Sequence, residues 1–258
     1  MRLRSFLHIT KFLKHNTRYE LRNTDLKTYH HIFFDLDHTL WDFERNSEET
    51  ISELFHELKM AERGVVSSKS LYLSFERANR EAWDLYHLNK IDKEELRISR
   101  FIRTLAENGI PNHPELAESM AQFYLSVCPT KPHLFDGSID ILDHLVSKYP
   151  LHLISNGFAE TTDMKVKASD ITKYFKTVIT PTHSGFKKPD KEMFLYALTK
   201  ANCKPELAIM IGDDLQADIL GAKNAGIDQV FFNPNKKSHD LNVTFEISKL
   251  EELKAILA

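Results

Sequence analysis

Short apolar runs alternate with helix-like segments along the second half of this chain. The runs typical of buried strands, including one earlier run, are residues 31–34, 151–154, 178–180, 208–211 and 230–232. Apolar residues with helical spacing occupy residues 139–146, 191–200, 217–224 and 250–257. Strands that alternate with helices form a parallel sheet joined by right-handed crossovers. The pattern therefore predicts an α/β protein built on a parallel sheet.

A helical block interrupts this alternation directly after the first apolar run. Between residues 42 and 130 no segment resembles a strand, and apolar residues recur every three or four positions. Faces of this kind lie at residues 51–58, 71–85, 96–105 and 116–127. We therefore predict an all-helical cap domain at 47–129, inserted into a core made of residues 30–46 and 130–258.

The N-terminal segment differs from the rest of the chain because its charged residues are mostly basic. Lysine and arginine occupy positions 2, 4, 11, 14, 18, 22 and 27, whereas acids occupy only positions 20 and 25. Lys11 and Lys14 interrupt its apolar stretch and no A-x-A cleavage site follows, which argues against a signal peptide. We predict that residues 1–29 form a basic, disordered extension.

Charge and cysteine content narrow the partners and the compartment. The formal net charge is −3 at pH 7, so no strong positive field attracts nucleic acid. No apolar run is long enough to span a bilayer. Cys128 and Cys203 form no C-x-x-C pair and fit a reducing compartment. We expect a cytoplasmic protein, a monomer or a small homo-oligomer, that binds neither nucleic acid nor a membrane.

The first of four polar clusters near strand ends is D-x-D-x-T at residues 35–39. In open α/β sheets, ligands bind beyond the carboxyl ends of the strands. Asp35 and Asp37 point the same way if the segment is extended, so one carboxylate can attack phosphorus while the other handles a proton. Read alone, the same string also fits a turn capped by aspartate and threonine.

The other clusters offer groups that suit a phosphoryl group and a cation. S-N-G at 155–157 presents a hydroxyl and backbone N–H groups to phosphate oxygens. Lys188 precedes Pro189, which favours an extended backbone, and its ammonium can neutralise a phosphoryl group and a nucleophile. The acids of G-D-D-x-x-x-D at 212–218 suit a hard cation such as Mg²⁺, although an aspartate there can instead cap the next helix.

Together, D-x-D-x-T, S-N-G, K-P-D and G-D-D-x-x-x-D resemble, in this order, the motifs of the haloacid dehalogenase superfamily, and of its phosphatase majority. The match covers about residues 30–235. The longer strings at 33–43, 155–158 and 231–234 are similar to the bacterial pyrimidine 5′-nucleotidase group, which acts on nucleoside monophosphates. The resemblance implies a Rossmann-like core and a small phosphorylated substrate, a nucleotide.

The resemblance also implies a role for each matching residue. Asp35 is expected to be the nucleophile that attacks phosphorus. Asp37 is expected to protonate the leaving oxygen and then to activate the water that breaks the aspartyl-phosphate. Ser155 and Asn156 are expected to bind the phosphoryl group, and Lys188 to stabilise its charge and that of Asp35.

A Mg²⁺ cofactor is expected from the same resemblance. Its ligands would be the Asp35 carboxylate, the Asp37 backbone carbonyl and Asp213. Asp218 would orient metal-bound water. Asp214 stands where the family more often has a small polar residue, which leaves open whether Asp214 or Asp218 also binds the metal.

Other functions have to be weighed against a nucleotidase. A sugar-phosphate phosphatase or a phosphomutase stays open, since the motifs do not choose among monoesters. A 2-haloacid dehalogenase would use Asp35 on carbon but needs neither Asp37 nor Mg²⁺. A signalling receiver module would be shorter and lack the helical block, and an interaction protein should have lost one of the motifs. We therefore expect a Mg²⁺-dependent phosphomonoesterase that acts through an aspartyl-phosphate, with a nucleoside 5′-monophosphate as substrate.

Substrate choice is expected to come from the helical cap, which would close over the site as a lid. Residues of the cap able to grip a flat base by stacking or polar contacts are Phe75, Trp83, Tyr86, Asn79, Arg80 and Arg97. Trp83, Tyr86 and His87 would instead be buried if they form the core of the cap.

Overall fold

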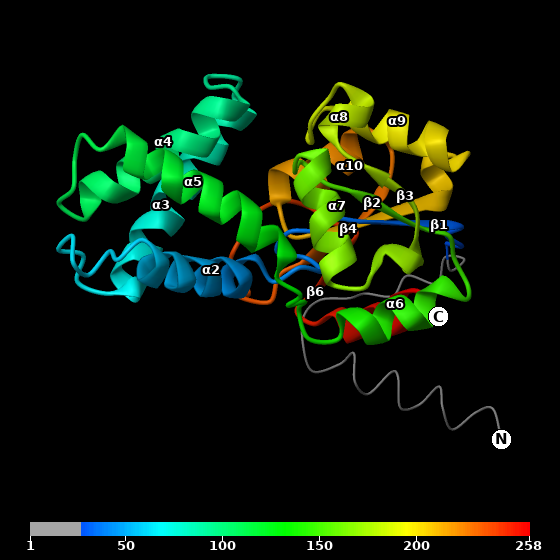
Figure 1. Cartoon of the computed structure of the whole chain (residues 1–258). Coiled ribbons are helices and arrows are strands. Elements are labelled where there is room, and N and C mark those ends of the chain that lie inside the picture. The colour runs from blue at the N-terminus through cyan, green and yellow to red at the C-terminus, as the bar shows by residue number, and fades with distance from the viewer. Residues whose placement is uncertain (1–26) are drawn as a thin grey trace.

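Six parallel strands form one sheet in the order β3-β2-β1-β4-β5-β6 (Figure 1). The strands are β1 (His31–Phe34), β2 (Leu151–Ile154), β3 (Phe175–Ile179), β4 (Ala208–Gly212), β5 (Asp228–Phe232) and β6 (Phe245–Ile247). β1 lies between β2 and β4, and the chain order reverses direction there. Such a reversal opens a crevice at the carboxyl ends of the strands. The α/β fold with a parallel sheet is confirmed, and its switch point lies at the end of β1.

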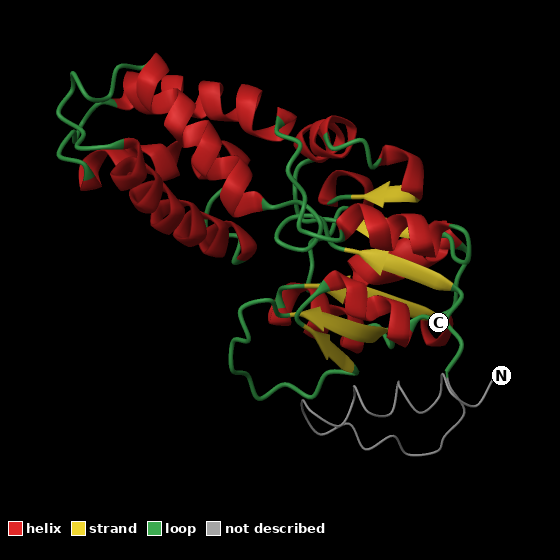
Figure 2. Cartoon of the chain, turned by 90° about the horizontal axis from the view of Figure 1, so that it is seen from below, coloured by secondary structure: helices red, strands yellow, loops and turns green. Residues whose placement is uncertain are grey.

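The strands are mainly apolar because helices cover both faces of the sheet (Figure 2). Ile32 and Phe34 point into one core layer and Phe33 into the other, and all three are fully buried. The helical elements around the sheet are α6 (Ser138–Val146), α7 (Ala159–Ala168), η2 (Thr172–Tyr174), α8 (Pro181–Ser184), α9 (Lys191–Ala201), η3 (Pro205–Leu207), η4 (Leu215–Leu220), α10 (Gly221–Asn224), η5 (Leu250–Glu252) and α11 (Leu253–Ile256).

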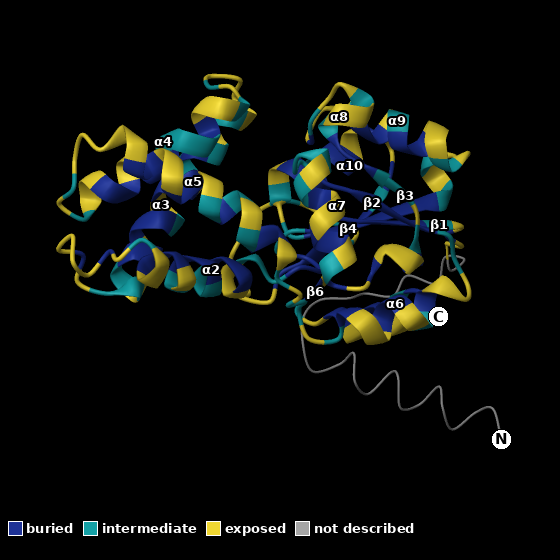
Figure 3. Ribbon diagram, in the orientation of Figure 1, coloured by how far each residue is buried: buried dark blue, intermediate teal, exposed yellow. Residues whose placement is uncertain are grey.

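Only helices occur in the described chain between Phe43 and Val127, and they pack beside the sheet rather than on it (Figure 1). They are α2 (Phe43–Glu57), α3 (Ser68–His87), α4 (Lys93–Glu107) and α5 (Pro114–Val127). At the centre, Phe75 and Phe101 are fully buried and their rings stack at 5.1 Å. Figure 3 shows the buried side of these helices facing inward and exposed residues outside.

Two chain segments connect this helical bundle to the sheet, and hydrogen bonds join them. Asn46 donates its amide to the His133 carbonyl (2.8 Å), and His133 donates its backbone N–H to Asn46 Oδ1 (3.1 Å). Trp41 donates Nε1 to the Lys131 carbonyl (3.0 Å). α2 begins at Phe43, so its first turn lies before the boundary that we expected at residue 47. The connections therefore form one braced stalk.

The computed structural model describes residues 27–258, so the expected disorder of residues 1–26 lies outside the described range. The last residues of the expected extension behave differently from that expectation. Tyr29 is 6 % exposed and donates its hydroxyl to Asp228 (2.7 Å). Lys27 forms an ion pair with the same carboxylate (2.7 Å). The folded core therefore begins before residue 30.

Several elements differ from the expected pattern. β6 and α7 were not expected, because β6 has only three residues and α7 is largely polar. The helix expected at 217–224 is divided into a π-helical turn, η4, and α10, and the one expected at 250–257 into η5 and α11. β3 begins at Phe175, earlier than expected. Across residues 27–258, none of the helices is apolar and long enough for a bilayer span.

Candidate active site

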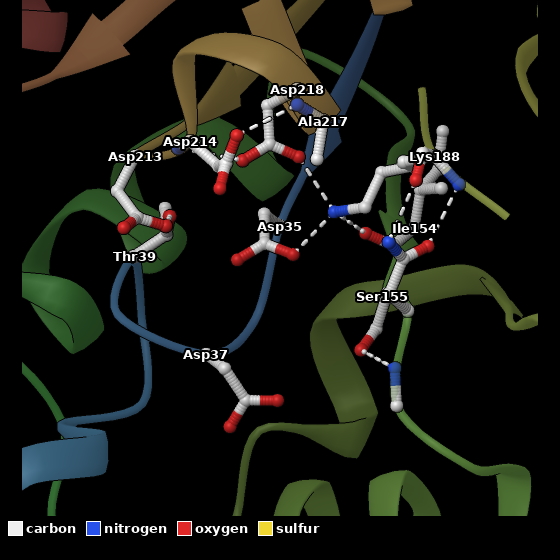
Figure 4. Close-up of polar contacts among 12 residues, drawn as sticks. Asp35, Asp37, Thr39, Ile154, Ser155, Lys188, Asp213, Asp214, Ala217 and Asp218 are labelled. Carbon is white, nitrogen blue, oxygen red and sulfur yellow. Dashed lines mark hydrogen bonds and ion pairs between the residues drawn. The ribbon is translucent and has the colours of Figure 1, made fainter. Parts of the chain in front are cut away.

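Side chains from the ends of β1, β2 and β4 meet at one edge of the sheet (Figure 4). Asp35 follows β1 directly, and its backbone N–H donates to the Ile211 carbonyl of β4 (2.9 Å). This bond continues the β1–β4 ladder by one residue and holds the Asp35 backbone rigidly. The residue is 6 % exposed. The first aspartate of D-x-D-x-T is therefore fixed at the bottom of the crevice.

The chain turns back immediately after Asp35. Trp41 and Leu40 both donate their backbone N–H groups to the Leu36 carbonyl (2.8 and 2.9 Å). His38 has a φ of 64°, a conformation that histidine adopts more readily than most residues. The turn brings Thr39 Oγ1 to within 3.3 Å of Asp213 Oδ1. It thus ties the β1 loop to the β4 loop.

Lys188 is the central cation of the site. Its Nζ lies 2.5 Å from Asp35 Oδ1, 2.6 Å from Asp218 Oδ1 and 2.9 Å from the Ile154 carbonyl oxygen. Burial alone would lower the pKa of this lysine, but the carboxylates of Asp218 and Asp35 outweigh burial and raise the pKa above its usual value. The ammonium therefore stays charged and neutralises the negative charge of one of the carboxylates around it.

Asp218 packs so closely against residue 212 that this residue must be glycine. It is 1 % exposed and accepts the backbone N–H of Asp214 (3.1 Å). A Cβ at Gly212 would lie 2.3 Å from Asp218 Oδ2, closer than real atoms approach. We expected Asp218 to orient metal-bound water, whereas its carboxylate here pairs with Lys188. Gly212 thus allows Asp218 to reach the lysine.

Three carboxylates converge around this lysine. Oxygen atoms of Asp35, Asp213 and Asp218 all lie within 4.8 Å of one another. Burial raises the pKa of Asp35 and that of Asp218, and it raises the pKa of Asp213 to about 7. Lys188 balances one negative charge, so the cluster favours a further cation. Carboxylate oxygens are the ligands that Mg²⁺ prefers, and this donor set fits it.

Asp214 has a different role from Asp213. Its Oδ1 accepts the backbone N–H groups of Gln216 (2.8 Å) and Ala217 (2.7 Å), so it caps η4. This is the capping alternative that the sequence left open for the G-D-D cluster. Of the two adjacent acids, Asp213 is the one that joins the carboxylate cluster.

The β2 loop supplies Ser155 and Asn156. Ser155 is 1 % exposed, and its Oγ accepts the backbone N–H of Gly157 (3.0 Å). Asn156 accepts the Lys188 backbone N–H (2.8 Å) and donates to the Lys188 carbonyl (2.9 Å). The amide that we expected to bind substrate therefore holds the backbone of the central lysine. Ser155 and Asp37 lie on the same side of Asp35 in Figure 4.

A second lysine, which no sequence motif singled out, contacts the site from α7. Lys165 Nζ lies 2.5 Å from Asp37 Oδ1. Asp35 and Asp37 thus have different cationic partners. Lysines on a polar helix usually face solvent, which is why Lys165 did not stand out. The available signal was its place beside Thr162 and Val166, which are buried on the same face of α7.

The tip of the cap touches the core next to the site. Trp83 stacks on Phe158, which follows the S-N-G loop, with ring centroids 5.9 Å apart, and Tyr86 meets the edge of the same ring at 5.7 Å. His87 Nε2 lies 3.4 Å from Asn156 Nδ2. Trp83 and Tyr86 are half-buried and His87 is exposed. These aromatic residues form the contact between cap and core rather than the interior of the cap.

The other cap residues that we expected to grip a base do not all face the site. Phe75 is fully buried inside the cap, and Asn79 is buried and accepts a hydrogen bond from Arg100 (2.8 Å). Arg80 forms a surface pair with Glu76 on its own helix (3.3 Å). Helical spacing shows which residues of α3 share a face. It does not show which of them lie inside the cap and which contact the core domain.

Arg97 links the cap to the core. It forms an ion pair with Glu160 of α7 (2.8 Å), and Lys93 contacts the same carboxylate (2.5 Å). Both cations also lie over the ring of Phe158, at 5.3 and 4.4 Å from its centroid. The α3–α4 tip is therefore held against the core by charges as well as by rings.

Comparison with known proteins places this arrangement in a family. A model described as haloacid dehalogenase-like hydrolase matches residues 32–232. The HAD-hydrolase YfnB of Bacillus subtilis is 29 % identical over 90 % of this chain and 97 % of its own. The crystal structure of YfnB bound to magnesium superposes with a TM-score of 0.80, at 28 % identity, covering 90 % of this chain and 99 % of that one.

Two relatives carry a more specific name. Pyrimidine 5′-nucleotidase PynA of Streptococcus pneumoniae is 30 % identical over 87 % of this chain and 93 % of its own. Pyrimidine 5′-nucleotidase YjjG of Escherichia coli is 26 % identical over 88 % of this chain and 96 % of its own. The family match runs from Ile32 in β1 to the end of β5 and includes every polar cluster of the crevice. The chain belongs to the haloacid dehalogenase-like hydrolase family.

Proposed function

We propose that this chain is a Mg²⁺-dependent phosphatase that transfers the phosphoryl group of a small monoester to Asp35 and then to water. The observation that carries the proposal is the contact of one buried ammonium, on Lys188, with both Asp35 and Asp218. Phosphoryl transfer needs positioning and charge neutralisation more than any other contribution. A buried carboxylate beside a fixed cation meets that requirement.

In the first step Asp35 attacks phosphorus in line with the leaving oxygen. Lys188 neutralises the incoming negative charge, and Ser155 offers its hydroxyl to a phosphoryl oxygen. Asp37 gives a proton to the departing ester oxygen, which leaves as an alcohol. The O–P bond to Asp35 forms as the P–O bond to the leaving group breaks.

In the second step water hydrolyses the acyl phosphate on Asp35. Asp37, now a carboxylate, accepts a proton from the water as it attacks phosphorus. Inorganic phosphate leaves, and both aspartates return to their starting states. Mg²⁺ held by Asp35, the Asp37 carbonyl and Asp213 would supply charge neutralisation on the phosphoryl oxygens.

The substrate class follows from the relatives and from the cap. PynA and YjjG are named as pyrimidine 5′-nucleotidases. The half-buried ring of Trp83, at the contact between cap and core, suits a planar base. We therefore propose pyrimidine nucleoside 5′-monophosphates, with dUMP and dTMP among the better substrates. A phosphate-release screen over nucleotides, sugar phosphates and pyrophosphate with Mg²⁺ tests this directly.

A sugar-phosphate phosphatase is the second candidate. A glyceraldehyde 3-phosphate phosphatase of Methanothermobacter thermautotrophicus is 35 % identical, but over only 46 % of this chain. If sugar phosphates are hydrolysed far faster than every nucleotide, the nucleotidase proposal is wrong and the phosphatase proposal survives. The dehalogenase alternative is less well supported, since carbon chemistry gives no reason for the Asp213 and Asp218 carboxylates to converge with Asp35.

Replacing Asp37 by asparagine should impair the enzyme more with poor leaving groups than with good ones. General acid catalysis contributes about 10²–10⁴-fold, so kcat/KM for dUMP should fall by that order. p-Nitrophenyl phosphate should be affected less, because its leaving group needs little protonation. Single-turnover kinetics that show both formation and breakdown of the intermediate unchanged would remove Asp37 from this role. Asp163→Asn, an exposed change on α7, is the control.

Replacing Trp83 by alanine should weaken nucleotide turnover while sparing p-nitrophenyl phosphate. Stacking on one aromatic ring contributes roughly 1–3 kcal/mol, so kcat/KM for dUMP should fall about ten- to hundredfold. Phe75→Leu in the cap interior is the comparison, because it should lower the melting temperature without changing the ratio of the two substrates. If Trp83→Ala lost both activities equally and also had a lower melting temperature, Trp83 would only join the cap to the core.

A further inference from the structure

Lys165 is a buried lysine whose ammonium contacts the carboxylate of Asp37. The residue is 9 % exposed, and its Nζ lies 2.5 Å from Asp37 Oδ1. Within residues 27–258 its ammonium forms an ion pair with no other carboxylate. Burying an ammonium is strongly unfavourable unless a partner compensates. The burial of Lys165 therefore depends on Asp37, and the position of Asp37 is coupled to Lys165.

Aromatic rings hold the same ammonium from another side. It lies 4.2 Å from the centroid of the Trp41 ring and 5.7 Å from that of Phe43. Trp41 is fully buried, and its Nε1 donates to the Lys131 carbonyl on the second connection of the cap (3.0 Å). The ring cannot move without breaking the stalk. Lys165 is thus confined between a rigid ring and one carboxylate.

The helix that carries Lys165 is also anchored. Thr162 and Val166 are each 1 % exposed on the same face of α7, and α7 packs against η1 (Cys128–Thr130) at the end of the cap. Lys167 lies two residues further along and has the opposite environment. Its side chain is 69 % exposed, and its ammonium lies 3.7 Å from Asp163 on the surface. The helix therefore offers a matched control lysine.

We propose that Lys165 is the positioning residue for Asp37. It holds the Asp37 carboxylate, which extends from a loop, at a fixed place beside the phosphoryl pocket. This inference rests on the proposed phosphatase function, in which Asp37 exchanges a proton with the ester oxygen and with water. Such a group must stay within hydrogen-bond reach of the reacting oxygen. A displacement of about 1 Å can lower the rate about 10²-fold.

The test compares kcat/KM for dUMP and for p-nitrophenyl phosphate in Lys165→Met, Lys165→Arg, Lys167→Met, Asp37→Asn and the Lys165→Met, Asp37→Asn double variant. The value of kcat/KM reports the steps up to departure of the leaving group. Lys165→Met should lose about ten- to hundredfold with dUMP and much less with p-nitrophenyl phosphate. Lys165→Arg, which keeps a cationic donor, should recover most of the loss. Lys167→Met should match the wild type.

The double variant separates a positioning role from a structural one. If Lys165 acts through Asp37, adding Lys165→Met to Asp37→Asn should cost no more than about threefold, because the residues act as one unit. Losses that multiply, or equal losses with both esters, would overturn the positioning role and favour direct contact of Lys165 with the phosphoryl group. Melting temperatures are measured for every variant, and Lys165→Gln replaces Lys165→Met if the latter does not fold.

Failure of this inference can be distinguished from failure of the proposed function. If the wild type hydrolyses neither ester, or if Asp37→Asn leaves dUMP turnover unchanged, the proposed function fails and the role of Lys165 fails with it. If Asp37→Asn is strongly impaired while Lys165→Met is not, the role of Lys165 alone is overturned.

Discussion

Replacing Asp35 by asparagine should abolish turnover, lowering kcat by a factor on the order of 10⁴ or more, as loss of a catalytic nucleophile does elsewhere. The amide has nearly the same shape as the carboxylate but is a poor nucleophile. Lys188 keeps its ion pair with Asp218 in this variant, so no buried charge is left without a partner. The measurement is steady-state phosphate release from dUMP and p-nitrophenyl phosphate with Mg²⁺.

The fold of this variant should be intact. Burial raises the pKa of Asp35, which means that folding makes its ionised form less favourable than it is in the unfolded chain. Removing the charge should therefore leave the melting temperature unchanged or slightly higher. Asp163→Asn on the exposed side of α7 serves as the control and should keep full activity. Activity of Asp35→Asn within about tenfold of the wild type would rule out the covalent mechanism.

Removing Mg²⁺ with EDTA should eliminate the activity, and adding Mg²⁺ should restore it. Ca²⁺ should support turnover poorly, because its larger and looser coordination misplaces the nucleophile. Asp213→Ala should raise the Mg²⁺ concentration needed for half-maximal activity by about tenfold or more. Asp214→Ala is the matched control, because the Asp214 carboxylate caps η4 and is not part of the carboxylate cluster. Its Mg²⁺ requirement should stay close to that of the wild type. Full phosphate release after chelation and dialysis would overturn the Mg²⁺ requirement.

The metal prediction has a pH dependence that does not need turnover. Burial raises the pKa of Asp213 to about 7, well above its value in an unfolded chain. A raised carboxyl pKa favours the folded state at low pH, and this contribution is lost as the pH rises through about 7. The metal-free protein should therefore be less stable at pH 8 than at pH 6. Because a cation offsets this loss, Mg²⁺ should raise the melting temperature more at pH 8.

Much of the fold and the centre of the site could be predicted from the sequence. The apolar runs identified five of the strands because a parallel sheet buried on both faces favours mainly apolar segments. Asp35 and Asp213 could be brought together in advance because the carboxyl ends of parallel strands meet at one edge of the sheet. Lys188, which follows α8, was added to them by the resemblance of its K-P-D motif. β6 and α7 were missed, since the first is too short and the second too polar to show a period.

Only the tertiary structure decided what each polar side chain does at that edge. Asp213 and Asp214 are adjacent and chemically identical, yet one joins the carboxylate cluster and the other caps a helix. Asn156 holds the backbone of Lys188, and Phe75 lies inside the cap. The period of a segment shows which residues share a face, but the element that meets this face is set by packing between segments far apart in the chain. Lys165 touches Asp37 across 128 residues for this reason.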